Sequence, residues 1–330
     1  MLPLWRVNLS TTVSPSLPKM LVEIDTAAII AACIVIGILA ASLTLWILHL
    51  QLISRRYIPE ENVRAWPIGW INFGIFLCAM VLSVILIQIS AGQFIQFFSP
   101  NQLTLATEES IQSGETAKNI ADQPPLTPWM AVLAVLLLQL PLLAAFYGLR
   151  RFYPGNFAGR LNSQKIQAWQ AIRQVIPQFI RYLPIIWIVA YLWSVFLKIL
   201  QEQGIIGEFP PQQLVTLFTQ GGDPVAMTLL VIFAVVLAPI VEEIIFRGAI
   251  YRFLKSQTNI LPAQIISGTF FALMHVNLMS LLPLVVVGIV LARVYERSGN
   301  ILTSICFHSC FNGFSLFMLF MLSQSSVPFD

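Results

Sequence analysis

The sequence predicts an all-α polytopic membrane protein of about eight transmembrane helices, with a polar intramembrane site in its C-terminal half. Of its 330 residues, 57% are hydrophobic and only 10% are charged, and the mean hydropathy is +0.80. Soluble domains carry roughly 25% charged residues. The apolar residues also gather in long runs. We therefore expect an integral, multi-pass protein of a plasma membrane or of an organelle membrane of the thylakoid type.

Eight apolar segments are candidate spans, because about 20 apolar residues cross the hydrocarbon core of a bilayer. The fourth is short, but Arg181 and Lys198 flank it and can reach the two interfaces. The predicted spans are 27–50, 67–89, 128–149, 182–197, 227–248, 260–278, 281–295 and 301–322. They divide the chain into an N-terminal tail (1–26), a four-span region (27–200) and a C-terminal core (225–322).

Basic residues alternate with acidic ones from loop to loop, which predicts the orientation. The first, third, fifth and seventh loops hold most of the Arg and Lys, whereas the second and fourth are acidic. Because basic loops stay on the cytoplasmic side, both termini are expected to be non-cytoplasmic. The chain has no basic run of the kind that binds nucleic acid.

The segment 163–180, between the third and fourth predicted spans, has a helical repeat of apolar residues. Its apolar positions are Ile166, Trp169, Ile172, Ile176 and Phe179, with polar and basic residues on the other faces. This pattern indicates an amphipathic helix lying on the inner membrane surface. A helix packed on a neighbouring loop explains the pattern equally well.

Polar side chains interrupt three of the C-terminal spans. Glu242, Glu243 and Arg247 lie in the fifth, His275 lies in the sixth, and His308 and Asn312 lie in the eighth. Intramembrane ionisable residues are costly and are functional candidates by default. With a helical rise of about 1.5 Å per residue, Glu242, His275 and His308 all fall near mid-depth. The three helices are therefore expected to line one cavity.

These residue types suit hydrolysis by an activated water molecule. A desolvated glutamate is a competent base near neutral pH, so Glu242 with His275 could activate water. His308 and Asn312 could donate hydrogen bonds to the oxyanion of a tetrahedral intermediate. Glu243 and Arg247 are four residues apart and can pair within one helix, which favours a structural role. No serine stands beside a base, so covalent catalysis fits less well.

Together the motifs Glu242-Glu243-x-x-x-Arg247, Phe271-x-x-x-His275 and His308-x-x-x-Asn312 resemble those of the CAAX prenyl protease and bacteriocin-processing family, also called Abi or type II CAAX endopeptidases. The resemblance covers about 225–322. It implies an intramembrane endopeptidase in which Glu242 and His275 activate water while His308 and Asn312 stabilise the oxyanion. Glu243 and Arg247 would complete the first motif structurally. The implied partner is a membrane-tethered peptide or protein, such as a CAAX protein or a peptide precursor.

Several alternatives stay open. The family has been described both as metal-independent glutamate proteases and as metalloproteases. In a zinc-dependent version Glu242, His275 and His308 would be the ligands, and no cofactor is otherwise implied. The chain could also be a catalytically silent scaffold or immunity protein of the same fold. A proton- or cation-coupled transporter is a third reading, in which Glu242 and Glu243 would bind the ion.

Overall fold

The computed structural model describes residues 26–53, 62–98, 127–152, 161–162, 164–207, 217–218 and 222–323. The elements within these ranges are helices, which confirms the all-α prediction. The predicted N-terminal tail and most of the acidic second and fourth loops lie outside the described residues. The first four long helices are α1 (Thr26–Ile53), α2 (Trp70–Phe98), α4 (Pro128–Phe152) and α5 (Ala168–Glu202).

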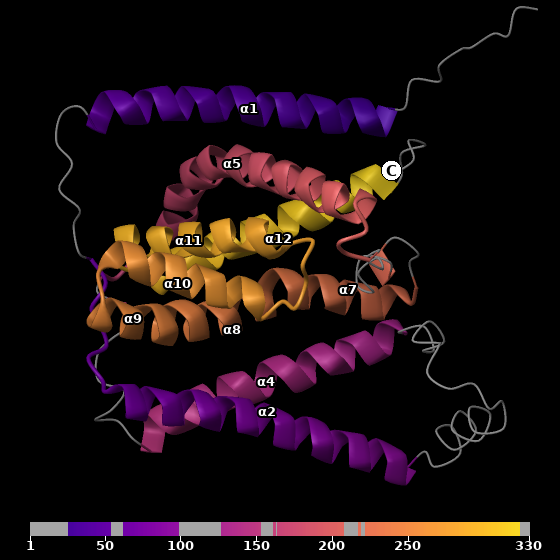
Figure 1. Ribbon diagram of the computed structural model, residues 1–330, viewed down its shortest axis with the longest axis vertical. Coiled ribbons are helices and arrows are strands. Elements are labelled where there is room, and N and C mark those ends of the chain that lie inside the picture. Colours follow the sequence, from indigo (N-terminus) through magenta and orange to yellow (C-terminus); the bar gives the residue numbers. More distant parts are fainter. Residues whose placement is uncertain are drawn as a thin grey trace, which may run out of the picture.

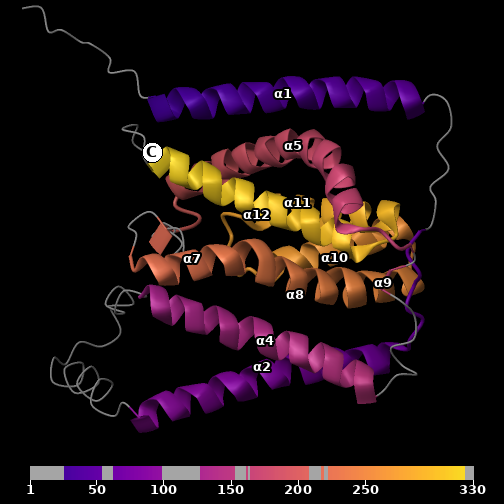
Figure 2. The same cartoon turned by 180° about the vertical axis from the view of Figure 1, so that it is seen from behind.

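The long helices run alongside one another in a broad layered bundle (Figures 1 and 2). In both views α1 lies at one edge, α2 and α4 lie at the opposite edge, and the C-terminal helices lie between them. Six described helices are long and apolar enough to cross a membrane. Their outward faces are rich in exposed Ile, Leu and Val, as lipid-facing surfaces require. The described chain is thus a polytopic membrane protein.

The fifth predicted span belongs to one continuous helix over Pro224–Gln257. Asp223 caps its first turn by accepting a hydrogen bond from the Ala226 amide at 2.9 Å, and Pro224 suits the first helical position. Its segments are α7 (Pro224–Ile232), η2 (Phe233–Leu237), α8 (Ala238–Ile245), η3 (Phe246–Tyr251) and α9 (Arg252–Gln257), with π-helical turns in η2 and η3. Such turns often accompany functional sites, and here they flank Glu242 and Glu243.

Helix α5 joins the predicted surface helix and the predicted fourth span into one element of 35 residues. Pro177 and Pro184 lie inside it, and a proline bends a helix because it lacks the amide donor. The helix is visibly bent, and its first turns run across the direction of the other helices (Figure 2). Trp169, Ile172 and Ile176 are exposed. These three residues of the predicted apolar face therefore do not pack on the described chain, whereas Phe179 packs against Phe307 and Phe314.

The last predicted spans are α10 (Ile260–Leu273), α11 (Leu281–Ser298) and α12 (Ile301–Ser323). Helix α10 has 14 residues, about 21 Å, so it is shorter than the hydrocarbon core. Helices α10 and α11 form a hairpin with a very close crossing, because a Cβ at Gly288 would lie 2.6 Å from the Gly268 Cα. Small residues permit such an approach between membrane helices.

Two connecting segments are fixed to the C-terminal core at one end of the bundle. Glu296 accepts hydrogen bonds from the backbone amides of Asn62 and Val63 at 2.9 and 3.1 Å. Asn300 donates its side-chain amide to the Gln164 carbonyl at 2.8 Å. This end is where the basic loops of the predicted cytoplasmic side gather. The core thereby fixes the segments that precede α2 and α5.

Candidate active site

The site is built around Glu243, whose carboxylate is fully buried. Arg247 Nη1 donates to its Oε1 at 2.9 Å, and His308 Nδ1 lies 3.0 Å from the same atom. The Ser304 hydroxyl donates to its Oε2. Both oxygens are therefore occupied by partners from α12 and from its own helix. A carboxylate held in this way is suited to orienting its neighbours and has little room to act on a substrate.

Arg247 ties this carboxylate to the helical hairpin. Its side chain is fully buried, and Nη2 donates to the Gly288 carbonyl at 2.9 Å. The guanidinium also lies 4.7 Å from the centre of the Phe271 ring, an arrangement that stabilises a desolvated cation. The Gly268–Gly288 contact thus sets the position of the acceptor that Arg247 uses. The structural role of Glu243 and Arg247 stays a prediction, and their ion pair is the observation that supports it.

Glu242 is the partly exposed carboxylate of the site. Its side chain is 20% exposed, and its Oε2 lies 3.8 Å from His308 Nε2. Its Oε1 lies 3.4 Å from Gln139 Nε2 on α4. The two glutamates are adjacent in sequence, yet Glu243 is enclosed while Glu242 retains an accessible oxygen. Of the two, Glu242 is the one that can meet a reactant.

His308 connects the two glutamates. Because Glu243 is a hydrogen-bond acceptor, the contact at 3.0 Å requires a proton on His308 Nδ1. The Nε2 atom of a neutral His308 then presents a lone pair toward Glu242. The distance of 3.8 Å between Glu242 Oε2 and His308 Nε2 is too short for a water molecule to lie directly between them. A water molecule to one side can still contact both atoms. A carboxylate that fixes the tautomer of a histidine is a common device in active sites.

His275 lies at the edge of this cluster. Helix α10 ends at Leu273, and the following turn includes Val276 with a positive φ of 46°. His275 is exposed, and its Nδ1 contacts the Phe271 carbonyl at 2.8 Å. The Phe271 ring lies against both histidines, with ring centres 4.7 Å from His275 and 5.5 Å from His308. No contact between His275 and Glu242 is found among the described residues.

Asn312 is hydrogen-bonded to the first π-helical turn, η2, of the helix over Pro224–Gln257. In that turn the Ala238 amide bonds to the Phe233 carbonyl, five residues back. The next residue is Pro239, which has no amide proton, so the Ala234 carbonyl lacks its donor. Asn312 Nδ2 donates to this carbonyl at 2.8 Å. One of its two amide protons is therefore used for structure, and the other stays available.

The described residues do not assemble the ligand set that zinc would need. A catalytic zinc site takes three protein ligands, and no group of three His, Cys, Asp or Glu side chains converges among the residues with assigned positions. Glu242 and His308 lie together, but His275 does not join them. The predicted zinc-binding version of the site does not fit this arrangement, and we assign no step to a metal.

Two residues of the site were not predicted from the sequence. Ser304 precedes His308 by one helical turn, so the four-residue spacing could have placed it on the same face. Gln139 was a polar residue within an apolar run of the third predicted span, which is itself a signal of function. Nothing in the sequence, however, says which helix faces α8. Its contact with Glu242 came only from the fold.

The fold and site define a polytopic helical membrane protein with a buried glutamate–arginine pair and an adjacent glutamate–histidine pair. Residues 224–314 match the family model "Type II CAAX prenyl endopeptidase Rce1-like". This part of the chain is similar to the type II CAAX endopeptidase family, which confirms the resemblance predicted from the three motifs.

One curated relative supports the same assignment. The Bacillus subtilis (strain 168) protein named "Putative membrane peptidase YdiL" is 36% identical over 93 residues. The matched region covers 28% of this chain and 38% of that protein. No solved structure matches the chain. The similarity thus concerns the C-terminal core, and α1, α2, α4 and α5 lie outside the family match.

Proposed function

We propose that this protein is an intramembrane endopeptidase that hydrolyses a peptide bond of a membrane-associated substrate. The observation that carries the proposal is the unequal environment of Glu242 and Glu243. Glu243 is enclosed and orients His308, whereas Glu242 is partly exposed and faces the second nitrogen of that histidine. This pairing of an accessible carboxylate with an oriented imidazole is suited to acid–base chemistry. CAAX-type proteins and peptide precursors are the substrate classes that the family match favours.

In the proposed reaction Glu242 takes a proton from water, and the hydroxide adds to the carbon of the scissile carbonyl. The resulting oxyanion accepts hydrogen bonds from the free amide proton of Asn312 and from His308 when its Nε2 is protonated. Glu242 then returns the proton to the departing nitrogen as the C–N bond breaks, leaving a carboxylic acid and an amine. Water activation by Glu242 together with His275 stays a prediction, because no described contact joins the two.

A comparison of peptide termini tests the proposal. Membranes from cells that produce the wild type, Glu242→Gln, His308→Ala or the control Glu202→Gln would be analysed by terminus-selective proteomics. Glu202 is an exposed carboxylate at the end of α5, so its variant makes the same chemical change away from the site. We expect specific new termini with the wild type and Glu202→Gln, and their loss, by about 100-fold or more, in the other two.

Each variant must accumulate to the level of the wild type for the comparison to count. If all four membranes give the same termini while deletion of the protein changes the phenotype of the cell, hydrolysis is the wrong function. A scaffold would then tolerate both site substitutions. A transporter would lose uptake with Glu242→Gln but keep it with Asn312→Ala, whereas a peptidase needs both residues.

A further inference from the structure

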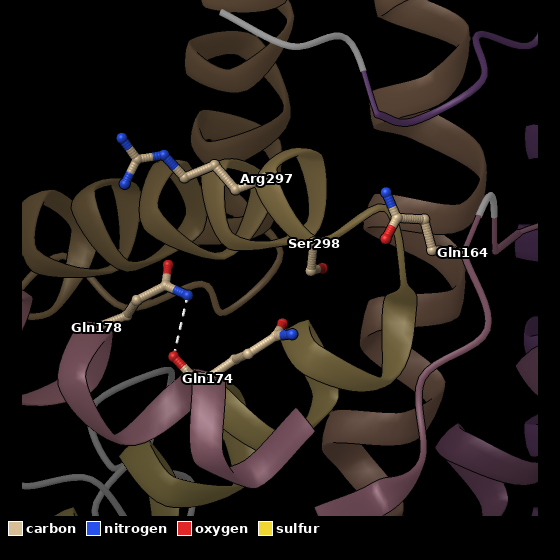
Figure 3. A pocket seen from close by; sticks show the side chains of 5 residues that line it. All are labelled: Gln164, Gln174, Gln178, Arg297 and Ser298. Carbon is tan, nitrogen blue, oxygen red and sulfur yellow. Dashed lines mark hydrogen bonds between the residues drawn. The ribbon is translucent and has the colours of Figure 1, made fainter. Parts of the chain in front are cut away.

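A polar pocket lies away from the glutamate site, between the N-terminal part of α5 and the end of α11. It has a volume of about 260 Å³ and is lined by Gln164, Gln174, Gln178, Arg297 and Ser298 (Figure 3). Three primary amides supply both donors and acceptors to this space. The oxygen Oε1 of Gln178 is buried without a hydrogen-bond partner. The pocket is thus prepared for a ligand that carries both hydroxyl groups and acceptor oxygens.

Basic side chains gather next to this pocket. Arg181 follows Gln178 by less than one helical turn on α5, and Arg293 precedes Arg297 by one turn on α11. Arg181 and Arg297 repel each other, and both of them, like Arg293, repel the protonated form of His49 near the end of α1. The arginines of α5 and α11 therefore bring positive charge to one place, next to the end of α1.

No acidic side chain in the described part of the chain forms an ion pair with these arginines. Glu296, the carboxylate of the same α11 turn, is bound to Lys255 at 2.9 Å and to Tyr251. The Nε atoms of Arg181 and Arg293 are buried without hydrogen-bond partners. Like charges held close together destabilise the fold, and a bound anion relieves the repulsion. An anion from outside the described chain would be a suitable partner for these arginines.

The position of the cluster indicates where the anion comes from. The centre of the Trp46 ring on α1 lies 5.8 Å from the guanidinium carbon of Arg181, and the indole N–H donates to the Arg181 carbonyl at 3.1 Å. Tryptophan collects at the boundary between headgroups and hydrocarbon. The cluster also lies at the end of the bundle where the basic loops gather, the predicted cytoplasmic side. Basic pockets between helices on that side are sites for anionic headgroups.

We propose that this pocket and its arginines bind the phosphate of an anionic phospholipid whose headgroup carries hydroxyls. The arginines hold the phosphate oxygens through charge-assisted hydrogen bonds. The glutamine amides receive and donate hydrogen bonds with the hydroxyl groups. A lipid bound here contacts α1, α5 and α11 together and fixes the N-terminal helices against the C-terminal core. This binding is independent of the proposed peptidase reaction.

Native mass spectrometry of the full chain in detergent tests the proposal. The protein would be titrated with phosphatidylglycerol or with phosphatidylcholine of the same acyl chains. We expect preferential retention of phosphatidylglycerol by the wild type, weakened by about fivefold for each of Arg293→Gln and Arg297→Gln. The matched control is Arg173→Gln, an exposed arginine of α5 that does not line the pocket. It makes the same change of charge and should retain the lipid.

Three results would overturn the proposal. The first is equal retention of the two lipids by the wild type. The second is an equal loss in Arg173→Gln, which would mean attraction by general surface charge. The third would come from a thermal-unfolding measurement in which soluble glycerol 3-phosphate is added in place of lipid. If it raises the thermal midpoint as much as phosphatidylglycerol does, the pocket binds a free phosphate and the lipid source is excluded. Circular dichroism would show that each variant is folded.

A different observation, at the glutamate site, supports a second inference that rests on the proposed function. Gln139 of α4 is 6% exposed, its Nε2 lies 3.4 Å from Glu242 Oε1, and its own Oε1 is buried without a partner. Helix α4 runs beside α8 in both views (Figures 1 and 2), outside the matched family region. A buried amide oxygen beside a reactive carboxylate can accept a hydrogen bond from water at the site.

We infer that Gln139 is a positioning residue for Glu242 and for the water that Glu242 activates. Its amide proton holds Oε1 of the carboxylate, which leaves Oε2 directed toward His308. Its unpartnered oxygen then accepts a hydrogen bond from one O–H of the water, so that the other O–H points at the base. The N-terminal region would thereby complete a site whose motifs lie wholly in the C-terminal core.

The test uses a quenched fluorescent peptide that covers the cleavage site found in the terminus comparison. Gln139→Leu is expected to lower kcat by about tenfold with little change in KM, since oriented groups act on the reaction step. Gln139→Asn keeps the amide and should restore part of kcat.

The outcomes distinguish a failure of the proposed function from a failure of the role inferred for Gln139. If the wild type does not cleave the peptide, the proposed function fails and Gln139 has no reaction to assist. If the wild type is active, Glu242→Gln is inactive and Gln139→Leu keeps the wild-type kcat, only the role of Gln139 is wrong. A residue needed for folding alone would lower the yield of active protein without lowering kcat per folded molecule.

Discussion

The C-terminal core contains two buried carboxylate clusters of similar construction in different surroundings. Glu243 binds Arg247, Ser304 and His308 within the bundle. Glu296 binds Lys255, Tyr251 and two backbone amides at the end of the bundle. Both are buried and well hydrogen-bonded, so neither burial nor an ion pair distinguishes the cluster of the candidate site. What distinguishes the first cluster is its neighbour Glu242, which keeps an accessible oxygen beside an oriented histidine.

The largest effect is expected from removing the cation of the inner cluster. Arg247→Met leaves the fully buried Glu243 without its ion-pair partner, and breaking a buried pair from one side costs about 3–5 kcal/mol. We expect a loss of folded protein, measured as the free energy of unfolding in mixed micelles. A variant that folds with wild-type stability would mean that Glu243 is neutral in the native protein.

A smaller loss is expected at the outer cluster. Lys255→Met removes one donor from Glu296, but the Tyr251 hydroxyl and the amides of Asn62 and Val63 still hold the carboxylate. We expect a cost of about 1–3 kcal/mol, with peptidase activity retained per folded molecule. Equal costs for Lys255→Met and Arg247→Met, in the same unfolding measurement, would remove the distinction between the two clusters.

The close helix crossing behind the inner cluster gives the next test. Gly288→Ala places a Cβ 2.6 Å from the Gly268 Cα, and backbone cannot yield as a side chain can. Overpacking of this kind costs about 1–3 kcal/mol, and it moves the carbonyl that Arg247 uses. Activity should fall together with stability. The control Gly248→Ala meets the Leu161 Cδ2 at 2.9 Å, a flexible side chain, so it should be tolerated better.

The smallest effect is expected for Tyr251→Phe, which deletes one hydrogen bond of 2.6 Å to Glu296. Three donors then remain on that carboxylate, so we expect about 1–2 kcal/mol of destabilisation and unchanged cleavage. The thermal midpoint and the cleavage rate would be measured on the same preparation. A change in cleavage rate greater than the change in the folded fraction would connect the outer cluster to the active site.

The sequence alone predicted the helices and the depth of the polar residues, but it could not predict how those residues face one another. A rise per residue gives the position of Glu242, His275 and His308 along their helices. It leaves open how each helix is rotated about its axis. In the structure the rotation brings His308 to both glutamates, whereas the early end of α10 leaves His275 exposed beyond the Phe271 ring. The pairing of Glu242 with His275 needed information that periodicity does not contain.

The sequence by itself determined the membrane class, the all-α fold and the resemblance of the C-terminal core to the type II CAAX endopeptidases. It did so because hydrocarbon tolerates long apolar helices and few charges, and because the motif residues have fixed spacings. Only the tertiary structure decided that Gln139 of α4 lies beside Glu242. The same holds for the hydrogen bond from Asn312 to the Ala234 carbonyl, which has no backbone donor because of Pro239. The tertiary structure also decided that glutamines of α5 and Arg297 of α11 line one pocket. Such contacts depend on which helix faces which, and side-chain packing between helices sets that choice.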